Sequence, residues 1–511
     1  MDAVIPGIDA VIFDIGGTLV EEAPAATPVD ALVARPLPGV LEVVAGCARH
    51  HRVAALTDTA VMDEATVRAL LAPVGLDALL EVVVTSHDVG AAKPDPRGVL
   101  EVCRRLGVSP GRALLVGDRS VDRDAAAAAG TAFVATDAGL PDAVTRAVAA
   151  RSGPFGAAAS AVEPLDEDAR AAALARQAQL TKPAGSLGRL EEIGVLLAAI
   201  TGRCPPPIPA RPAVGVFAGD HGVVASGVTP WPQDITASMV ANMANGGAAI
   251  NAIARQVGAA VSIVDVGVAA DVREVDGVEH RKVRAGTDDL LGGRAMTTAD
   301  AYAALDVGAE LASALVGRGH DLLVTGDMGI GNTTPSAALI AAFTRHDAAA
   351  VTGRGTGIDD TMLATKTKVV AQAVGRVEGF LDPVSVLAEV GGLEIAAIGG
   401  FVIGAAAARV PVVVDGVIAC AALLAADALV PGLRRHCIAG HRSSEPGATV
   451  ALAHLGLDPV LDLQLRLGEG TGACLAVPVV QAAARVLGEM ATFDQLEPPA
   501  STSDGSATDG S

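Results

Sequence analysis

Aromatic residues are scarce in this 511-residue chain: Phe, Trp and Tyr together make up 2% of it, although 51% of the residues are hydrophobic. The hydrophobic cores must therefore be built from Ala, Val, Leu and Ile. That composition suits buried parallel strands covered by Ala-rich helices. Because the chain is longer than one hydrophobic core usually supports, we expect at least two domains.

Basic residues are also in short supply. The chain has 37 Lys and Arg residues against 58 Asp and Glu residues, a formal net charge of -21. Such a charge repels nucleic acid and anionic membrane surfaces, so we expect neither as a partner. The longest apolar stretch, 395–408, is too short to span a bilayer, and the N-terminus lacks the basic segment of a signal peptide. We therefore expect a soluble, cytoplasmic protein.

Cysteine motifs are missing as well. The six cysteines are scattered, and neither a CxxC pair nor a zinc-ligand spacing with the ten histidines occurs. We expect free thiols in a reducing compartment.

The order of the predicted elements indicates an α/β fold with two parallel-sheet domains. Short β-branched runs alternate with Ala/Leu-rich helical stretches from residue 10 to about 140, and further strand–loop–helix units follow the small-residue segment 152–166. We place an N-terminal domain at 1–150, a linker at 151–164 and a second domain at 165–497. Residues 498–511 have no apolar pattern and are predicted to be a disordered tail.

Five side chains in the first domain occur in an order that phosphoryl transfer can use. Asp14 ends an apolar strand, Thr57 ends the next, Lys93 lies in AAKPDP, and Asp118 and Asp122 lie in GDRSVD. Together they supply a nucleophilic carboxylate, a hydroxyl and an ammonium for phosphate oxygens, and carboxylates for magnesium. Each residue alone has a simpler explanation, since an Asp at a strand end is often a turn or cap residue.

This set resembles the haloacid dehalogenase superfamily over about the first 140 residues. The resemblance implies that Asp14 is the nucleophile, that Thr57 and Lys93 bind phosphate, and that Asp14, Asp118 and Asp122 hold magnesium. The family's phosphatases usually carry a second Asp two residues after the nucleophile, as general acid and base, where this chain has Gly16. The short connection between Asp14 and Thr57 leaves no room for a large cap domain.

The second domain contains a glycine-rich loop between an apolar strand and an apolar helix, in DLLVTGDMGIGNTTPSAALIAAF. If Thr334 caps the helix and Pro335 lies in its first turn, the backbone N–H groups around 329–333 can bind phosphate. The loop lacks the lysine of an ATP-binding P-loop. The alternative is a turn that only packs the strand against the helix.

Two further segments carry candidate chemistry. Glu469 lies between two glycines in LGEGTG, where partial desolvation would raise its pKa towards that of a useful base; the alternative is a solvent-facing turn residue. His221, in GDHG, has no neighbouring Ser or Cys nucleophile, so we interpret it as a hydrogen-bonding residue that fixes a loop.

These segments, with LTKPAGSLGRLEE, GTGIDDTMLATK and GHRSSEPGATVALAHLGLDPV, closely resemble the nicotinate-nucleotide:dimethylbenzimidazole phosphoribosyltransferases from about residue 165 to 493. The resemblance implies a phosphoribosyltransferase α/β domain with a small helical subdomain, acting as a homodimer. It also implies that Glu469 is the general base. The family usually has Glu where this chain has Asp327, a second catalytic candidate. The predicted substrate-binding residues are Gln233, Gly329, Gly331, Asn332 and Lys366.

The expected reaction transfers phosphoribosyl from nicotinate mononucleotide to dimethylbenzimidazole, giving alpha-ribazole phosphate for cobalamin synthesis. We expect no metal or cofactor for this step, whereas the N-terminal domain would use magnesium. Three hypotheses stay open. The N-terminal domain could be a phosphatase acting on alpha-ribazole phosphate or only a binding domain, and the whole chain could be a non-enzymatic metabolite sensor.

Overall fold

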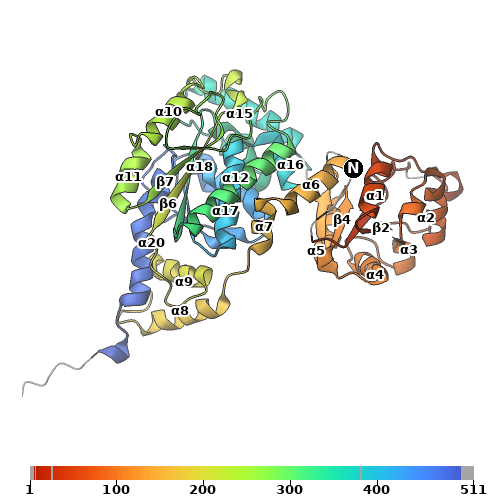
Figure 1. Cartoon of the computed structure of the whole chain (residues 1–511), viewed down its shortest axis with the longest axis horizontal. Helices are drawn as coiled ribbons and strands as arrows, with labels where there is room; N and C mark the ends of the chain where they lie inside the picture. Colours follow the sequence, from red (N-terminus) through yellow and green to blue (C-terminus); the bar gives the residue numbers. More distant parts are fainter. Residues whose placement is uncertain (1–4, 6, 25–26, 138, 380–381, 497–511) are drawn as a thin grey trace, which may run out of the picture.

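The computed structural model of the chain describes residues 5, 7–24, 27–137, 139–379 and 382–496. Two α/β units are visible in Figure 1, and helices α6 and α7 lie where they meet. The predicted tail, 498–511, lies outside the described residues.

The N-terminal unit contains a five-stranded parallel sheet of order β3-β2-β1-β4-β5. Alternate residues of β1 serve two cores: Val11 and Phe13 pack in one cluster, and Ala10 and Ile12 pack in another on the opposite face. The continuous apolar strands are therefore buried on both sides. The strands are β1 (Ala10–Asp14), β2 (Arg52–Thr57), β3 (Val82–Thr85), β4 (Ala113–Gly117) and β5 (Ala132–Ala135).

The helices of this unit are short and lie between the strands in sequence. They are α1 (Val40–Ala48), α2 (Glu64–Leu71), α3 (Ser86–Val89), α4 (Arg97–Leu106) and α5 (Ser120–Ala129), with 3-10 turns at Val29–Ala31, Ala72–Val74, Asp77–Leu79 and Pro110–Arg112. Between β1 and β2 the described chain forms one 3-10 turn and α1. The expected absence of a large cap domain there agrees with these elements.

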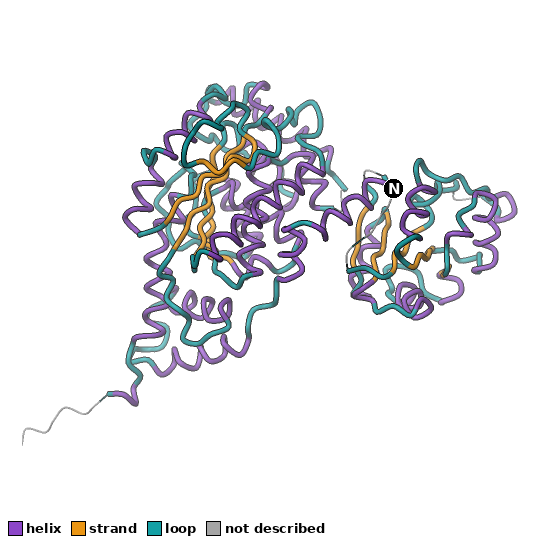
Figure 2. The backbone as a smooth tube through the Cα atoms, viewed as in Figure 1, coloured by secondary structure: helices purple, strands orange, loops and turns teal. Residues whose placement is uncertain are grey.

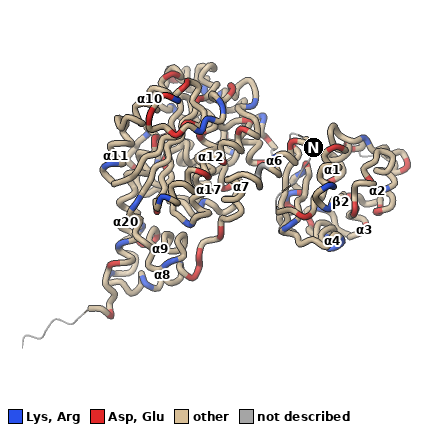
Figure 3. The backbone as a smooth tube through the Cα atoms, viewed as in Figure 1, with Lys and Arg blue, Asp and Glu red and all other residues tan. Residues whose placement is uncertain are grey.

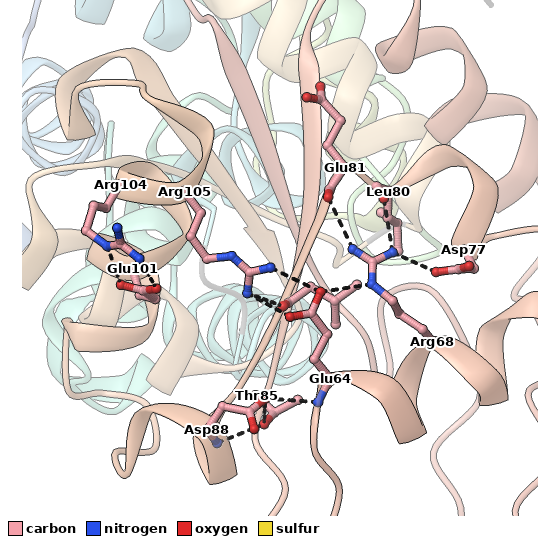
Figure 4. Close-up of polar contacts among 11 residues, drawn as sticks. Glu64, Arg68, Asp77, Leu80, Glu81, Thr85, Asp88, Glu101, Arg104 and Arg105 are labelled. Atoms are coloured by element: carbon pink, nitrogen blue, oxygen red, sulfur yellow. Dashed lines mark hydrogen bonds and ion pairs between the residues drawn. The ribbon is translucent and has the colours of Figure 1, made fainter.

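Charged side chains join α2 to α4 beside β3. Glu64 of α2 pairs with both Arg68 of its own helix and Arg105 of α4, each at 2.9 Å, and Arg68 also pairs with Asp77 at 2.7 Å (Figure 4). These groups are partly exposed, so each pair stabilises the unit by less than about 1 kcal/mol. The cluster is structural and lies outside the predicted site.

The C-terminal unit contains a six-stranded parallel sheet of order β11-β10-β9-β6-β7-β8. Figure 2 shows helices on both sides of its strands. The central strands correspond to the apolar runs of the sequence, whereas the edge strands β8 and β11 are too short to give a pattern. The strands are β6 (Pro212–Gly219), β7 (Ala260–Gly267), β8 (Val278–His280), β9 (Leu322–Met328), β10 (Val412–Val414) and β11 (Cys437–Ala439).

Two groups of helices cover the two faces of this sheet. One face packs with α12 (Thr298–Gly317), α13 (Thr333–Thr344), α14 (Ala348–Val351), α15 (Asp360–Arg376), α16 (Pro383–Val390), α17 (Leu393–Ala407), α18 (Val417–Leu429) and α19 (Pro446–Leu455). The other packs with α9 (Arg189–Thr201), α10 (Ile235–Ala244), α11 (Ala249–Val257) and α20 (Thr471–Glu489), and α8 (Glu167–Gln179) lies on α9. Further 3-10 turns occur at Gly222–Ser226, Leu433–His436 and Phe493–Gln495.

The segment predicted as a linker, 151–164, is largely helical. It contains the end of α6 (Leu140–Ser152) and all of α7 (Pro154–Ala161). Phe155 is buried in the core of the C-terminal unit, and its N–H donates to the Asp306 carboxylate of α12 at 2.8 Å. Small residues signalled a break in the sequence, but tertiary packing against α12 and α17 makes this segment a helix of the second unit.

A buried arginine also joins the two units. The Arg146 side chain, on α6, pairs with Asp142 of the same helix and with Asp382 before α16, where Nε and Oδ2 are 3.2 Å apart. Next to this contact lies a cleft of about 1370 Å³ that residues of both units line. None of the predicted site residues lines that cleft.

Among the described residues, one helix is long and apolar enough to cross a membrane, namely α20. More than half of its apolar window is buried within the protein, and it packs on α9 and α11. These contacts are those of a core helix.

Helices α12 and α17 are in backbone contact because glycines face each other. A Cβ atom added at Gly308 would lie 1.8 Å from the carbonyl oxygen of Ala397, and one added at Gly400 would lie 1.9 Å from that of Leu305. Neither position can accept a side chain unless the helices separate. The small residues of this chain therefore set the distance between the layers.

We expect Gly308→Ala to lower the free energy of unfolding by about 3 kcal/mol, the upper end of the usual cost of overpacking a core. Urea unfolding followed by the fluorescence of Trp231, the only tryptophan, measures this in the C-terminal unit. Gly317→Ala in the same helix is the control, because nothing lies within 4 Å of its Cβ position. Equal stability of the two variants would contradict the packing argument.

Candidate functional site

Acidic residues gather at the carboxyl edge of the C-terminal sheet. Asp220 follows β6, Asp327 lies near the end of β9, and Asp415 follows β10, so three adjacent strands bring carboxylates to one edge. All three are buried. Asp415 and Asp220 were not predicted as site residues, although Asp415 has the same signal as Asp327, an Asp at the end of an apolar strand.

The Glu469 loop reaches this edge through an unusual backbone. Gly468, Glu469 and Gly470 all have positive φ angles, of 81°, 63° and 89°. A Cβ added at Gly468 would lie 3.2 Å from both Asp327 oxygens, and one added at Gly470 would lie 2.8 Å from the carbonyl oxygen of Thr325. Glycines are thus needed for the loop to lie against β9. A positive φ is unstrained for glycine, so of these three residues only Glu469 is strained, at a cost of about 1–3 kcal/mol.

Glu469 is 4% exposed, which excludes a solvent-facing turn. Burial raises the pKa of its carboxyl group, and the backbone N–H of Ile250, at the start of α11, opposes this shift by donating to Oε2 at 3.3 Å. Glu469 is therefore a buried carboxylate at the N-terminal, positive end of the α11 dipole, and the N–H of Ile250 is its one described hydrogen-bond donor.

Asp327 has a different environment. Its Oδ2 accepts a hydrogen bond from Asn332 Nδ2 at 2.8 Å. Its pKa is raised well above its usual range, first by burial and then by the acidic neighbours Asp415 and Glu394. Burial and several acidic neighbours together favour the protonated acid at Asp327, whereas at Glu469 only burial does, so Asp327 is less suited than Glu469 to accept a proton.

Asp415 holds the start of α20. Its two oxygens accept from the backbone N–H groups of Gly470 at 3.2 Å and Ala473 at 2.8 Å. Burial raises its pKa to about 6, although these N–H groups favour the carboxylate. Asp415 therefore connects the end of β10 to the loop that carries Glu469, and it positions that loop.

His221 forms a buried pair with Glu394, with Nε2 and Oε1 2.9 Å apart. Burial disfavours the imidazolium, but the Glu394 carboxylate outweighs it and raises the pKa of His221. Both side chains are at most 1% exposed. This pairing joins the loop after β6 to the start of α17 and agrees with a loop-fixing role.

The glycine-rich loop leads into α13, which begins at Thr333 with Asn332 as its N-cap residue. The expectation that Thr334 caps the helix is wrong, since Thr334 lies within the first turn and its hydroxyl is buried without a described partner. Among the described contacts, the N–H groups of Gly331 and Thr333 donate to no other protein group. These free donors are the ones that an anion can use.

The two predicted glycines serve packing as well. A Cβ at Gly329 would lie 2.2 Å from the carbonyl oxygen of Gly219, and one at Gly331, with φ of 88°, would lie 2.9 Å from Val224 Cγ2. The packing alternative therefore accounts for Gly329, and both explanations apply to Gly331.

Lys366, on α15, is buried beside this loop. Its ammonium donates to Thr333 Oγ1 at 2.7 Å and to the carbonyl oxygen of Gly353 at 3.0 Å, which leaves one of its three donors. Burial lowers its pKa to about 8, although the Glu445 carboxylate opposes this. Glu445, which the sequence argument missed, also accepts from the N–H of Gly355 at 2.8 Å.

Gln233 precedes α10 and is half-buried, and no described side-chain hydrogen bond fixes it. Nearby, Thr236 Oγ1 accepts from the N–H of Ile330 at 3.1 Å. The start of α10 is therefore joined to the glycine-rich loop. The structure brings Gln233 to the same edge of the sheet as the other predicted residues of this unit.

The N-terminal unit has its own group of charges. Asp14 ends β1, while Thr57 and Asp118 lie at the ends of the flanking strands β2 and β4. Carboxylate oxygens of Asp14, Asp118 and Asp122 lie within 4.8 Å of one another, and the Lys93 ammonium bonds both Asp14 and Asp122. The structure thus brings all five predicted side chains to one edge.

Burial dominates the electrostatics of that group. It raises the pKa of Asp14 to about 7, with Lys93 opposing and Asp122 reinforcing the shift. Oδ2 of Asp14 is buried and has no described hydrogen-bond partner. Figure 3 shows Lys and Arg residues interspersed with Asp and Glu residues along the backbone of both units.

Comparisons with known proteins match a family to each part of the chain. The family described as phosphoribosyltransferase (DBI_PRT) matches residues 162–497, about two-thirds of the chain. The chain belongs to this phosphoribosyltransferase family. A haloacid dehalogenase-like hydrolase family matches residues 29–130, a range that includes Lys93 and Asp118 but begins after Asp14.

Relatives of the family match along almost their whole length. The chain is 56% identical over 350 residues to the nicotinate-nucleotide–dimethylbenzimidazole phosphoribosyltransferase of Salinispora tropica, covering 66% of this chain and 96% of that protein. It is 51% identical to the enzyme of that name from Desulforudis audaxviator, covering 65% and 94%. The crystal structure of the Thermus thermophilus enzyme is 47% identical, with a TM-score of 0.62, covering 65% and 98%. The family resemblance and the fold class predicted from the sequence are both confirmed.

We expect Asp415→Ala to lower the free energy of unfolding by roughly 2–4 kcal/mol, because two buried N–H donors lose their acceptor. Urea unfolding at pH 8, followed by Trp231 fluorescence, measures the change.

Asp462→Ala is the control, because the Asp462 side chain is 59% exposed and lies 3.8 Å from Arg442. We expect this variant to stay within about 0.5 kcal/mol of the unmodified chain. A similarly small effect of Asp415→Ala would show that Asp415 does not hold α20.

Proposed function

We propose that the C-terminal unit transfers phosphoribosyl from nicotinate mononucleotide to 5,6-dimethylbenzimidazole, giving alpha-ribazole 5'-phosphate and nicotinate for cobalamin synthesis. The observation that carries this proposal is Glu469, a buried carboxylate that a strained loop holds against β9. The names of the relatives supply the substrates, and the position of Glu469 supplies the base that the reaction needs.

In the proposed step, a benzimidazole nitrogen attacks C1' of the ribose from the face opposite nicotinate. The bond between C1' and the pyridine nitrogen breaks, and its electron pair neutralises the departing ring. The second benzimidazole nitrogen loses its proton to Glu469. Burial, which raises the pKa of Glu469, makes the carboxylate a stronger base than an exposed Glu.

The phosphate of the nucleotide is placed at the start of α13 in this proposal. Free N–H groups of Gly331 and Thr333, the helix dipole and the third donor of Lys366 all favour an anion there. Fixing the phosphate orients C1' for attack and converts a two-substrate encounter into a positioned reaction. The side-chain amide of Asn332, a predicted ligand, donates to Asp327 in this structure.

Four accompanying predictions concern the working enzyme. Since nicotinate leaves as a neutral ring, transfer needs no metal and should persist in EDTA. The homodimer and the cytoplasmic location stay predictions, as does the effect of Asp327 in place of the family's usual Glu.

We expect Glu469→Gln to lower kcat for transfer by roughly 10²–10⁴-fold, the usual contribution of a positioned general base. The amide keeps the size of the side chain, so Michaelis constants should change little. Product formation from the two substrates, measured by mass spectrometry, tests this, with Glu489→Gln at the exposed end of α20 as the control. Near-normal turnover would reassign the base, with Asp327 the next candidate. No product from the unmodified chain would favour a non-enzymatic sensor.

We expect Lys366→Ala to raise KM for nicotinate mononucleotide about 10–100-fold, the value of a charge-assisted hydrogen bond, with a smaller effect for dimethylbenzimidazole. In the unmodified enzyme this KM should also rise as the pH increases through about 8, because Lys366 loses its charge there. The pH effect should be absent in Lys366→Ala. Lys368→Ala, on the exposed side of the same helix, should behave as the unmodified enzyme.

A second function is favoured by the N-terminal charges. We propose that this unit is a magnesium-dependent phosphatase, with alpha-ribazole phosphate as a candidate substrate. Three carboxylates within 4.8 Å suit a hard divalent cation, and Asp14 Oδ2, buried without a described partner, is the expected ligand or nucleophile. When bound, magnesium would neutralise phosphate oxygens, while Asp14 attacks phosphorus and Lys93 and Thr57 orient the ester.

Phosphate release from alpha-ribazole phosphate should require magnesium and should disappear in Asp14→Asn, because the amide cannot form the phospho-aspartate. Transfer by the C-terminal unit should be unchanged in that variant. Release that persists in Asp14→Asn would show that the N-terminal unit does not act by this route.

A further inference from the structure

The N-terminal unit has a gap where its chemistry needs a proton donor. Gly16 stands two residues after Asp14, where a second carboxylate would protonate the leaving oxygen and activate water. Gly16 does not have a positive φ, and within 4 Å of its Cβ position the described neighbours are atoms of a single side chain, that of Glu22. Cγ of Glu22 lies 3.7 Å from that position, and Oε1 lies 4.0 Å from it.

The chain after Gly16 folds back so that Glu22 returns to this place. Gly16 is bridged to Val20, and Val20 is bridged to Pro36. The N–H of Gly17 donates to the carbonyl oxygen of Val20 at 2.9 Å, and the N–H of Glu21 donates to that of Arg35 at 2.9 Å. Residues 20–22 are therefore held as an extended segment against Arg35 and Pro36.

Neighbouring side chains of an extended segment point to opposite faces. The Glu21 carboxylate lies towards Arg35, with Oε2 and Nη1 3.8 Å apart. Glu22 is consequently directed to the other face, where Gly16 and the end of β1 lie. Glu22 is exposed, so water and a substrate can reach its carboxyl group.

From this placement we propose that Glu22 is the general acid and base of the N-terminal phosphatase, in the place of the missing side chain at position 16. This inference rests on the phosphatase function proposed above. If Glu22 of the returning segment supplies the acid, a carboxylate at position 16 is not needed. A Cβ at Gly17, with φ of 76°, would clash with Asp118 at 2.2 Å.

The step balances with Glu22 protonated at the start. Asp14 Oδ attacks phosphorus, the bond from phosphorus to the ester oxygen breaks, and that oxygen takes the proton of Glu22. The Glu22 carboxylate then removes a proton from water, and the resulting hydroxide attacks the phospho-aspartate. The bond from phosphorus to Asp14 breaks, so phosphate and both original carboxyl states are restored.

The test compares kcat/KM of the full chain, with magnesium, on glycerol 3-phosphate and p-nitrophenyl phosphate. We expect Glu22→Gln to lower the value for the alkyl ester by roughly 10²-fold or more, the contribution of a general acid. The value for the aryl ester should fall much less, because p-nitrophenolate leaves without a proton. Gly16→Asp added to Glu22→Gln should restore hydrolysis of the alkyl ester.

Glu21→Gln is the matched control and should leave both values unchanged, since Glu21 faces Arg35. Unchanged hydrolysis in Glu22→Gln would overturn the inference. So would an equal loss on both esters that Gly16→Asp does not restore, because that pattern means a structural role for the segment.

Two further outcomes separate this inference from the phosphatase itself. Hydrolysis by Gly16→Asp but not by the unmodified chain would leave the phosphatase site in place and overturn the role of Glu22. If neither protein hydrolyses either ester or alpha-ribazole phosphate, both proposals are overturned. Transfer activity of the C-terminal unit serves as the internal measure that this unit is intact in each variant.

Discussion

The hydrogen bonds that backbone N–H groups at the start of α20 donate to the Asp415 carboxylate are the interaction on which the transferase site depends. They fix the first turn of the helix against β10, and so leave the preceding residues, Gly468 to Gly470, only a left-handed path across the end of β9. Glu469 thereby becomes a buried carboxylate at a defined place. If the loop were not held against β9, the Glu469 carboxylate would be solvated by water and would be a weaker base.

Different groups stabilise the buried carboxyl groups at the two sheet edges. In the C-terminal unit, acidic groups outnumber nearby cations, and backbone N–H groups, Asn332 and His221 supply most of the described partners. In the N-terminal unit, Lys93 lies between Asp14 and Asp122 and carries that role. The first arrangement suits proton transfer by carboxyl groups. The second suits a bound phosphate with a cation, because the Lys93 ammonium lies among the carboxylates and Oδ2 of Asp14 has no described hydrogen-bond partner.

Both units use the same structural rule with different chemistry. Parallel strands bring their carboxyl ends to one edge, and the loops that follow supply the reactive groups. The functions proposed above put the phosphate at Asp14 in one unit and at the start of α13 in the other. The joint between the units, with Arg146 and the helix α7, has its own packing and involves none of these groups.

The sequence by itself determined the two parallel sheets, their central strands and the family, because apolar β-branched runs and long motif strings are local features. It also named Glu469, Lys366 and the five charged or hydroxyl residues of the N-terminal unit. Only the tertiary structure decided that Asp415 positions Glu469, that Asn332 bonds Asp327, that 151–164 is helical and that Glu22 reaches Gly16. The physical reason is that each of these features depends on segments that lie far apart in the sequence or on the path of a loop. Packing between distant segments and the path of a loop leave no local pattern in the sequence.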